Sequence, residues 1–137
     1  LSGNITDQIG GRLKHRTSQI LSEITGGKYK EVIMDEELHI FVNTGERTVP
    51  AGRLSRGTLE QIYFALRMAA GELFCREETY PVILDDVFGM YDEDRLASVL
   101  RWLHKENRQV TISTCHKREM EILDKEGIPY QKILLQV

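Results

Sequence analysis

The sequence predicts an α/β fold in which a parallel sheet is flanked by helices. In residues 81–137, short apolar runs alternate with helical patterns, as in crossover connections between parallel strands. The first half begins with a helical pattern and continues with two strand patterns around an acidic turn, which predicts a β-hairpin. A chain of 137 residues, 41% of them apolar, is long enough for one domain with its own core.

The first predicted element is an amphipathic helix within residues 1–25. Apolar side chains recur there at spacings of three, four and seven residues, with charged side chains between them. The apolar positions are Ile5, Ile9, Leu13, Ile20, Leu21 and Ile24. So narrow a stripe is typical of the end of a coiled coil, although the segment is too short to show sustained heptads. Gly26 and Gly27 should end the helix, because glycine adopts the left-handed conformation without steric cost.

Two strand patterns follow, at residues 29–34 and 38–42. Both are rich in apolar and β-branched side chains, and the acidic residues 35–37 between them predict a turn. Residues 44–53 contain two glycines and a proline, so we expect a loop there.

The rest of the chain alternates helices and strands. Between residues 58 and 74 the apolar side chains form a helical stripe of full core-facing width. Residues 81–84 are apolar throughout, which is typical of a parallel strand buried on both faces. The predicted order is helix 58–74, strand 81–84, helix 93–106, strand 110–113, helix 117–126 and strand 130–137.

Composition and charge argue against several classes of protein. With 18 basic and 21 acidic side chains, the formal charge of −3 does not suit a strongly basic nucleic-acid binder. No apolar run approaches the roughly 20 residues that span a bilayer, and no signal peptide is visible, so we expect no membrane association. Cys75 and Cys115 lack the CxxC spacing of a disulfide framework or a cysteine-based zinc site. The sequence thus predicts a soluble protein of a reducing compartment, the cytoplasm.

Two carboxylates end the apolar strand at 81–84. In an open α/β sheet, ligands bind beyond the carboxyl ends of the strands, which is where Asp85 and Asp86 fall. Adjacent carboxylates repel each other unless a cation or a proton lies between them. Mg²⁺ prefers oxygen ligands and often accompanies phosphate, so it is a natural occupant. The alternative is a solvated acidic turn without a role.

The start of the helix at 58–74 is a candidate phosphate site. Free amides and the positive end of the helix dipole suit an anion, Gly57 allows close approach of the backbone, and Ser55 adds a hydroxyl donor. The alternative is a capping box of Thr58 and Gln61, which needs no ligand, and taken alone this segment favours the cap.

Two single residues complete the candidate site. His116 follows the strand at 110–113, and the alternative for it is an ordinary surface histidine. Asp92 precedes the helix at 93–106, and the alternative for it is a helix N-cap.

In combination, these motifs resemble the carboxyl-terminal half of an ABC-type ATPase head of the SMC, RecF and RecN group, and most of all the YhaN-type coiled-coil ATPases. The residues similar to the signature motif are Leu54, Ser55, Arg56, Gly57 and Thr58. Residues 82–86 resemble the Walker B strand, residues 89–92 the D-loop, and His116 the switch histidine. The resemblance covers residues 26–137 and implies that residues 1–25 are the end of a coiled coil.

The resemblance implies that two heads enclose ATP between them. Ser55 and the amide of Gly57 would contact the γ-phosphate of ATP held by the partner head, and Asp92 would line the seam of this homodimer. Each head's signature motif would complete the site of the other.

The resemblance also implies roles for the residues at the strand ends. Asp85 would hold Mg²⁺ through water, Asp86 would orient or deprotonate the attacking water, and His116 would contact the γ-phosphate. Phosphoryl transfer depends mainly on positioning and charge neutralisation, so these roles are chemically sensible.

The sequence departs from the family pattern at three points. Arg56 replaces the first glycine of the signature motif, so its guanidinium would either reach phosphate or project into solvent. Asp86 stands where most ABC proteins have glutamate, which is one methylene longer. The Walker A loop is absent from the 137 residues, and the resemblance places it in an amino-terminal lobe. We therefore expect this chain alone to be inactive as an ATPase.

Two functions from different classes follow. The first is a lobe of an ATP-hydrolysing head that serves DNA repair or chromosome maintenance, with DNA or a nuclease or accessory subunit as a partner. The alternative is an assembly or binding module that keeps the fold without hydrolysing ATP. A metal-dependent phosphatase or nuclease built on Asp85 and Asp86 is disfavoured, because only His116 is available as a further ligand.

Overall fold

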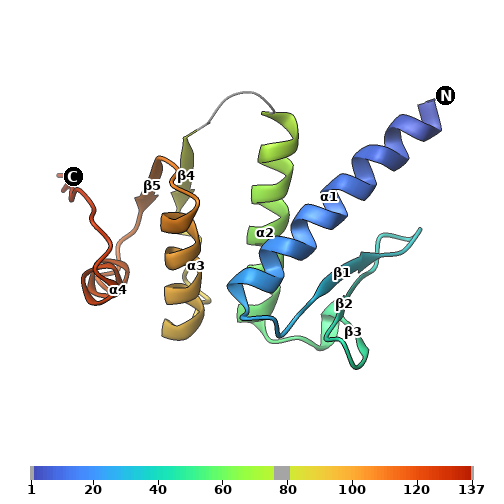
Figure 1. The fold of residues 1–137 in the computed structure, drawn as a ribbon. Coiled ribbons are helices and arrows are strands. Elements are labelled where there is room, and N and C mark those ends of the chain that lie inside the picture. Colours follow the sequence, from blue (N-terminus) through green and yellow to red (C-terminus); the bar gives the residue numbers. More distant parts are fainter. Residues whose placement is uncertain (1, 76–80, 137) are drawn as a thin grey trace.

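The computed structural model describes residues 2–75 and 81–136, with side chains from Gln8 onward. Leu1 and Val137, at the ends of two predicted elements, and the side chain of Ile5 therefore lie outside the described residues. Figure 1 shows the arrangement of the elements. Their order is α1 (Ser2–Ile24), β1 (Glu31–Met34), β2 (Ile40–Asn43), β3 (Thr48–Pro50), the 3₁₀ helix η1 (Ala51–Arg53), α2 (Arg56–Phe74), β4 (Val82–Asp85), α3 (Glu93–Lys105), β5 (Val110–Ser113) and α4 (Arg118–Glu126).

Helix α1 crosses α2 with its carboxyl-terminal half and extends away from the other helices with its amino-terminal half (Figure 1). Ile20, Leu21 and Ile24 are buried in the core, whereas residues 8–15 are exposed or half-buried. The chain leaves the helix through Gly26 and Gly27, whose φ angles of 62° and 83° confirm the predicted left-handed end.

The hairpin is part of a three-stranded antiparallel sheet in the order β1-β2-β3. Val32 pairs with Val42, and Phe41 pairs with Pro50 on the outer strand. The prediction of a loop over 44–53 is therefore wrong for Thr48–Pro50 and for the following 3₁₀ turn. The strand lies at the edge of the sheet, where a proline is tolerated because its missing N–H faces away from the neighbouring strand.

The second sheet, among the described residues, pairs β4 with β5 in parallel and sets Asp85 opposite Ser113. Val82 and Leu84 face the core. Ile83 is 61% exposed on the other face, so the prediction of a strand buried on both faces is wrong for this residue. The side chains that the structure describes cover one face of this sheet, that of Val82 and Leu84.

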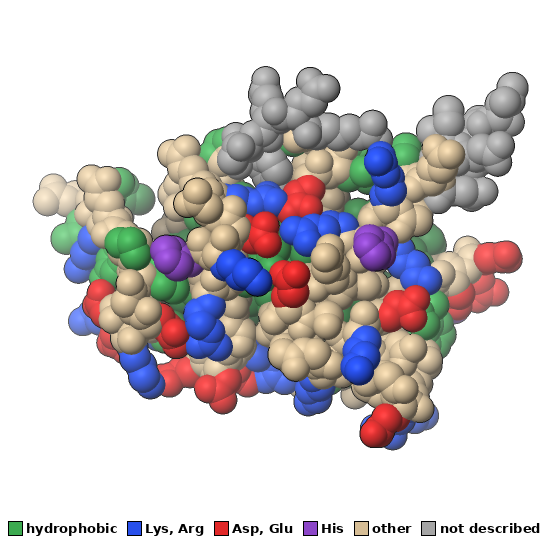
Figure 2. Space-filling model, viewed as in Figure 1, with side chains coloured by type: hydrophobic (Ala, Val, Ile, Leu, Met, Phe, Trp, Pro, Cys, Tyr) green, Lys and Arg blue, Asp and Glu red, His purple; other side chains and the backbone are tan. Residues whose placement is uncertain are grey.

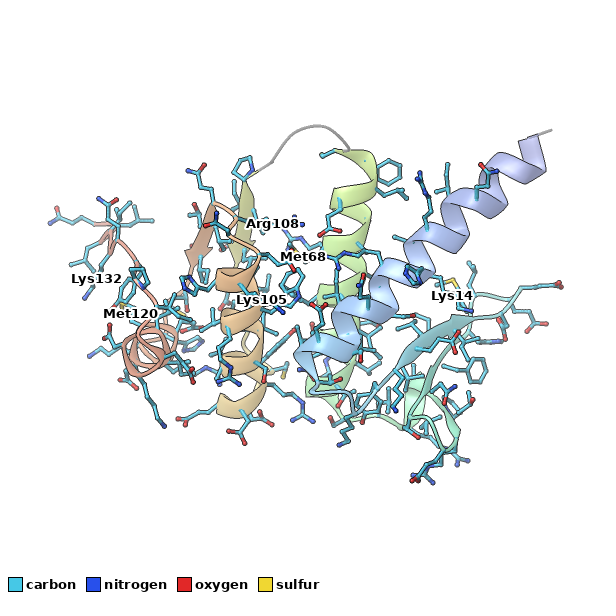
Figure 3. All side chains as sticks on the ribbon, viewed as in Figure 1. Lys14, Met68, Lys105, Arg108, Met120 and Lys132 are labelled. Atoms are coloured by element: carbon cyan, nitrogen blue, oxygen red, sulfur yellow. The ribbon has the colours of Figure 1, made fainter. Side chains whose placement is uncertain are left out.

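Helices α2 and α3 supply nearly half of the buried apolar side chains among the described residues. Phe64 and Trp102 meet edge to face with ring centroids 5.8 Å apart. Glu72 of α2 pairs with Arg16 of α1 and with Arg108, which lies between α2 and α3 (Figure 3). Figure 2 shows acidic and basic side chains intermingled over these helices.

The segment after α4 differs from the prediction of a strand at 130–137. Residues 130–136 form no strand, and Ile133, Leu134 and Leu135 are 73%, 77% and 82% exposed. Its apolar side chains fit a strand, but within residues 2–75 and 81–136 it pairs with no other strand. None of the described helices is both long and apolar enough to cross a membrane.

Candidate functional site

The carboxyl ends of β4 and β5 bring two of the predicted site residues together. The strands are parallel and in register at Asp85 and Ser113, so the residues that follow them leave the same edge of the sheet. The amide of Asp86 donates to the carbonyl of Ser113 over 2.8 Å and extends the ladder by one bond. Asp86 itself has a φ of 50°, in the left-handed region. Few non-glycine residues adopt this conformation, and aspartate is one of the more tolerant.

At this edge Asp86, Cys115 and His116 form a cluster of three metal-binding side chains. One ligand atom from each lies within 4.8 Å of the others, and all three residues are exposed. Cys115 Sγ is 3.8 Å from His116 Nε2, and the amide of His116 donates to Thr114 Oγ1 over 3.0 Å. Asp85 is also exposed, on the uncovered face with Ile83. Cys115 was not among the predicted site residues, because no metal motif in the sequence includes it.

Ser55, and not Thr58, caps the amino-terminal end of α2. Ser55 is the N-cap, and its Oγ accepts from the amide of Thr58 over 3.2 Å. The predicted capping box of Thr58 and Gln61 is therefore wrong: Thr58 lies within the first turn, and Gln61 is buried one turn later. Leu54, just before the cap, is half-buried against the core.

The side chain of Arg56 lies in solvent. It is 68% exposed, and its Nε lies 3.3 Å from Glu60 Oε1, one turn along the same helix. A contact of this guanidinium with phosphate stays a prediction.

Gly57 is packed closely against the loop that precedes α3. A Cβ atom at this position would lie 3.2 Å from the carbonyl oxygen of Met90 and 3.2 Å from Cδ of Arg95. Most Cβ contacts in proteins are wider, so the missing side chain lets the start of α2 and this loop approach each other. The sequence predicted close approach at Gly57 to a ligand, and the structure shows close approach to protein.

The loop between β4 and α3 is anchored by buried aromatic rings. Phe88 and Tyr91 are 1% and 3% exposed and meet edge to face, with centroids 5.2 Å apart. The Tyr91 hydroxyl donates to the carbonyl of Glu60 over 3.0 Å, and burial raises the pKa of Tyr91. From α4, Arg118 donates to the carbonyls of Phe88 and Tyr91. The predicted D-loop is thus held from both sides.

Asp92 ends this loop as the N-cap of α3, as one of its two alternatives predicted. It accepts from the amide of Arg95 over 2.8 Å and forms an ion pair with the Arg95 guanidinium. The same guanidinium donates to Thr58 Oγ1 over 3.1 Å and to Ser55 Oγ over 3.3 Å. Arg95 therefore joins the predicted D-loop to the predicted signature motif. Its position three residues after an N-cap aspartate is the only sequence signal for this role.

The donor set suits the groups that the sequence predicts. Asp85 offers carboxylate oxygens at the sheet edge, as a hard cation such as Mg²⁺ requires. The first turn of α2, with free amides and the Arg95 guanidinium beside it, presents positive charge of the kind that holds a phosphate. A shallow pocket of about 180 Å³ is lined in part by Tyr29, Gln61 and Arg95, and none of the residues that the sequence predicted for the site lines it.

Comparison with known proteins shows sequence relatives of far greater length. No family model matches this chain. The uncharacterized protein YhaN of Bacillus subtilis is 34% identical over 111 residues, which are 77% of this chain and 12% of that protein. The uncharacterized protein Rv1278 of Mycobacterium tuberculosis is 40% identical over 70 residues, which are 50% of this chain and 8% of that protein. The chain thus spans about an eighth or less of these relatives.

Solved structures show the same fold. An SMC ATPase studied for ATP-driven dimerisation and DNA-stimulated activation superposes with a TM-score of 0.72 at 15% identity, over 88% of this chain and 78% of that one. The SMC head domain of Thermotoga maritima gives 0.62 at 21% identity, over 88% and 44%. The Pyrococcus furiosus Smc head, bound to the C-terminal domain of ScpA, gives 0.63 at 14%, over 87% and 32%. The predicted α/β head fold is confirmed, while the likeness to RecF and RecN stays a prediction.

Proposed function

We propose that this chain is one lobe of an SMC-type head that binds and hydrolyses ATP and dimerises around it. The observation that supports this most is the placement of Asp86 and His116 at one sheet edge, followed by a rigid loop that Arg95 ties to the start of α2. The predicted Walker B strand, D-loop and signature motif all lie in this region. The short loop between β4 and α3 connects the sheet edge at Asp86 to Asp92, beside the start of α2.

The proposed roles at the sheet edge follow from charge and exposure. Asp85, whose exposed carboxylate suits Mg²⁺, would hold the ion that accompanies ATP. Asp86 would accept a proton from the attacking water or orient it, and His116 would hold the phosphate with its ring nitrogen. Both side chains are accessible, and the hydrogen bond to Ser113 fixes the backbone of Asp86.

The start of α2 would act on ATP bound to a partner head. Ser55 Oγ accepts from the amide of Thr58 and from Arg95, which leaves its O–H as the donor toward Thr58 Oγ1. This O–H would turn to the phosphate when the partner's nucleotide is bound. The Arg95 guanidinium, which is ion-paired with Asp92, lies beside it and offers further N–H donors. Asp92 would lie at the seam between the heads, where its backbone is fixed by the cap of α3.

The phosphate cradle has to come from a second lobe. The 137 residues contain no Walker A loop, so we propose that this chain alone binds ATP weakly and does not hydrolyse it. In this view α1 is the end of a coiled coil that returns from that lobe. The half of α1 that extends away from the core agrees with such a connection.

The test uses a two-lobed head in which this chain is combined with an amino-terminal lobe that contains the Walker A loop. Asp86→Asn should lower ATP turnover by at least about 100-fold, since a positioned proton acceptor contributes 10²–10⁴-fold. Asparagine tolerates the left-handed backbone as well as aspartate does, so the substitution removes the charge without new strain. ATP-driven dimerisation, measured by light scattering, should persist.

Two further variants complete the test. Ser55→Arg should abolish ATP-driven dimerisation, because a bulky cation would fill the proposed contact with the partner's nucleotide. Glu46→Gln, an equal loss of charge in an exposed turn of the antiparallel sheet, should change neither property. If Asp86→Asn hydrolyses ATP as fast as the unaltered head, the proposed role of Asp86 is refuted. If the unaltered two-lobed head binds ATP and dimerises but hydrolyses none, the non-hydrolysing assembly module is the better description.

The biological setting is part of the proposal. An SMC-like head would serve DNA repair or chromosome maintenance, with DNA or a nuclease or accessory subunit as a partner. Stimulation of ATP turnover by duplex DNA would support this, and equal turnover with and without DNA would favour a protein partner.

A further inference from the structure

The cluster of Asp86, Cys115 and His116 contains a thiol, that of Cys115, for which the proposed ATPase has no use. Phosphoryl transfer with Mg²⁺ needs oxygen ligands, yet this cluster adds a thiol and an imidazole nitrogen to one carboxylate. Among the side chains that the structure describes, this is the one group of three or more His, Cys, Asp or Glu residues that converge in this way. All three are exposed, so an ion can reach them from solvent.

The spacing of the ligand atoms suits a tetrahedral Zn²⁺ ion. With bonds of about 2.3 Å to sulfur and about 2.0–2.1 Å to nitrogen, a tetrahedral angle places the two ligands about 3.6 Å apart. Cys115 Sγ and His116 Nε2 are 3.8 Å apart, and the carboxylate of Asp86 lies within 4.8 Å of both. Rotation of the side chains alone can therefore close the site.

The backbone holds the three ligands in place. The amide of Asp86 is bonded to Ser113 at the end of β5, and the amide of His116 is bonded to Thr114 Oγ1 in the turn that follows this strand. The CxxC rule failed to find this site because its ligands come from the ends of two strands and not from one local motif.

We propose that Asp86, Cys115 and His116 form a three-ligand binding site for Zn²⁺ with an open fourth position. The Cys115 thiol gives its proton to solvent as the sulfur coordinates the ion. Sulfur and nitrogen ligands favour Zn²⁺ over Mg²⁺, so physiological Mg²⁺ does not displace it.

Occupation of this site has a consequence for ATP turnover, and this part rests on the proposed function. Asp86 and His116 cannot bind Zn²⁺ and act on water and phosphate at the same time. Zn²⁺ therefore inhibits the assembled head, and Cys115 makes it sensitive to this ion.

The binding test needs only the 137-residue chain and the metal. Co²⁺ titrated into the reduced chain should give the near-ultraviolet charge-transfer band of a cobalt–thiolate bond, and Zn²⁺ should abolish the band by displacing Co²⁺. Cys115→Ser should eliminate the band and weaken Zn²⁺ binding by calorimetry at least tenfold, since even outer-shell substitutions cost about 10–100-fold. Cys75→Ser, which removes the other exposed cysteine at the end of α2, should leave both unchanged.

Each outcome decides the proposal. Circular dichroism spectra that match between the variants show that the fold is retained. A missing band in the unaltered chain, or equal Zn²⁺ affinity in Cys115→Ser, overturns the site. In the two-lobed head, Cys115→Ser should keep its turnover and raise the inhibitory Zn²⁺ concentration at least tenfold. A head without turnover refutes the ATPase but leaves the cobalt band as an independent result.

Discussion

Replacement of Phe88 should reveal how firmly the loop between β4 and α3 is anchored. Its ring is 1% exposed and contacts Tyr91 edge to face at 5.2 Å and Phe64 in a tilted arrangement at 6.5 Å. Deletion of a buried phenylalanine ring lowers the free energy of unfolding by about 3–5 kcal/mol. Because single domains are stable by only about 5–15 kcal/mol, Phe88→Ala should remove a large part of the total.

The loss can be measured by urea unfolding. With a slope of about 2 kcal/mol per molar urea, a loss of about 4 kcal/mol lowers the midpoint by about 2 M. Phe88→Leu keeps most of the apolar volume and loses the ring contacts, so it should cost about 1–2 kcal/mol.

The matched control is Met90→Ala in the same loop. Met90 is 59% exposed, so its truncation should change the free energy of unfolding by less than about 0.5 kcal/mol. If Phe88→Ala costs under about 1 kcal/mol, or if Met90→Ala costs as much, the ring does not anchor the loop. The rigid placement of Asp92, on which the proposed dimer seam depends, would then lose its support.

Two predictions concern turns far from the proposed site. Gly127→Ala should lower the free energy of unfolding by about 1 kcal/mol, because Gly127 ends α4 at a φ of 69°. Gly52→Ala, at a glycine with open space around it, should change little in the same urea experiment, and equal losses would contradict the role of φ. The backbone amide of His39 donates to Asp35 and holds the pKa of that carboxyl below its ordinary value. A lowered pKa in the folded state adds stability above about pH 4, which is lost as the pH falls through the folded pKa. A carbon-detected NMR titration should therefore find Asp35 still ionised below pH 4, Asp35→Asn should flatten the acid dependence of unfolding, and an ordinary pKa would refute the contact.

Much of the fold was predictable from local patterns. Asp92 was expected as a possible N-cap and is one, and the paired glycines 26 and 27 end α1 as glycines commonly do. The apolar runs at 81–84 and 110–113 became neighbouring parallel strands, so the meeting of their ends at one edge followed from topology.

The errors have physical causes. Ser55 and Thr58 are both hydroxyl residues at the start of one helix, and only the backbone conformation decides which of them caps it. The strand at 48–50 was missed because Pro50 suits a loop equally well, and the edge position that tolerates it depends on the neighbouring strand.

The contacts that shape the candidate site were largely beyond sequence reasoning. Arg95 reaches Ser55 across 40 positions, and Arg118 reaches Phe88 across 30. Periodic patterns in a sequence indicate helices and strands, but they do not indicate which distant residue a long arginine side chain will contact. Cys115 was set aside for its lack of a CxxC partner, although its neighbours in space supply the other ligands.

At position 86, the residue that is best for folding stability differs from the residue that the proposed ATP hydrolysis requires. Glycine adopts a φ of 50° freely, whereas a side chain there costs up to about 1 kcal/mol. A library selected for stability alone should therefore enrich glycine at position 86, and one selected for turnover of the assembled head should keep the carboxylate. Laboratory evolution for stability and laboratory evolution for turnover should therefore select different residues at this position.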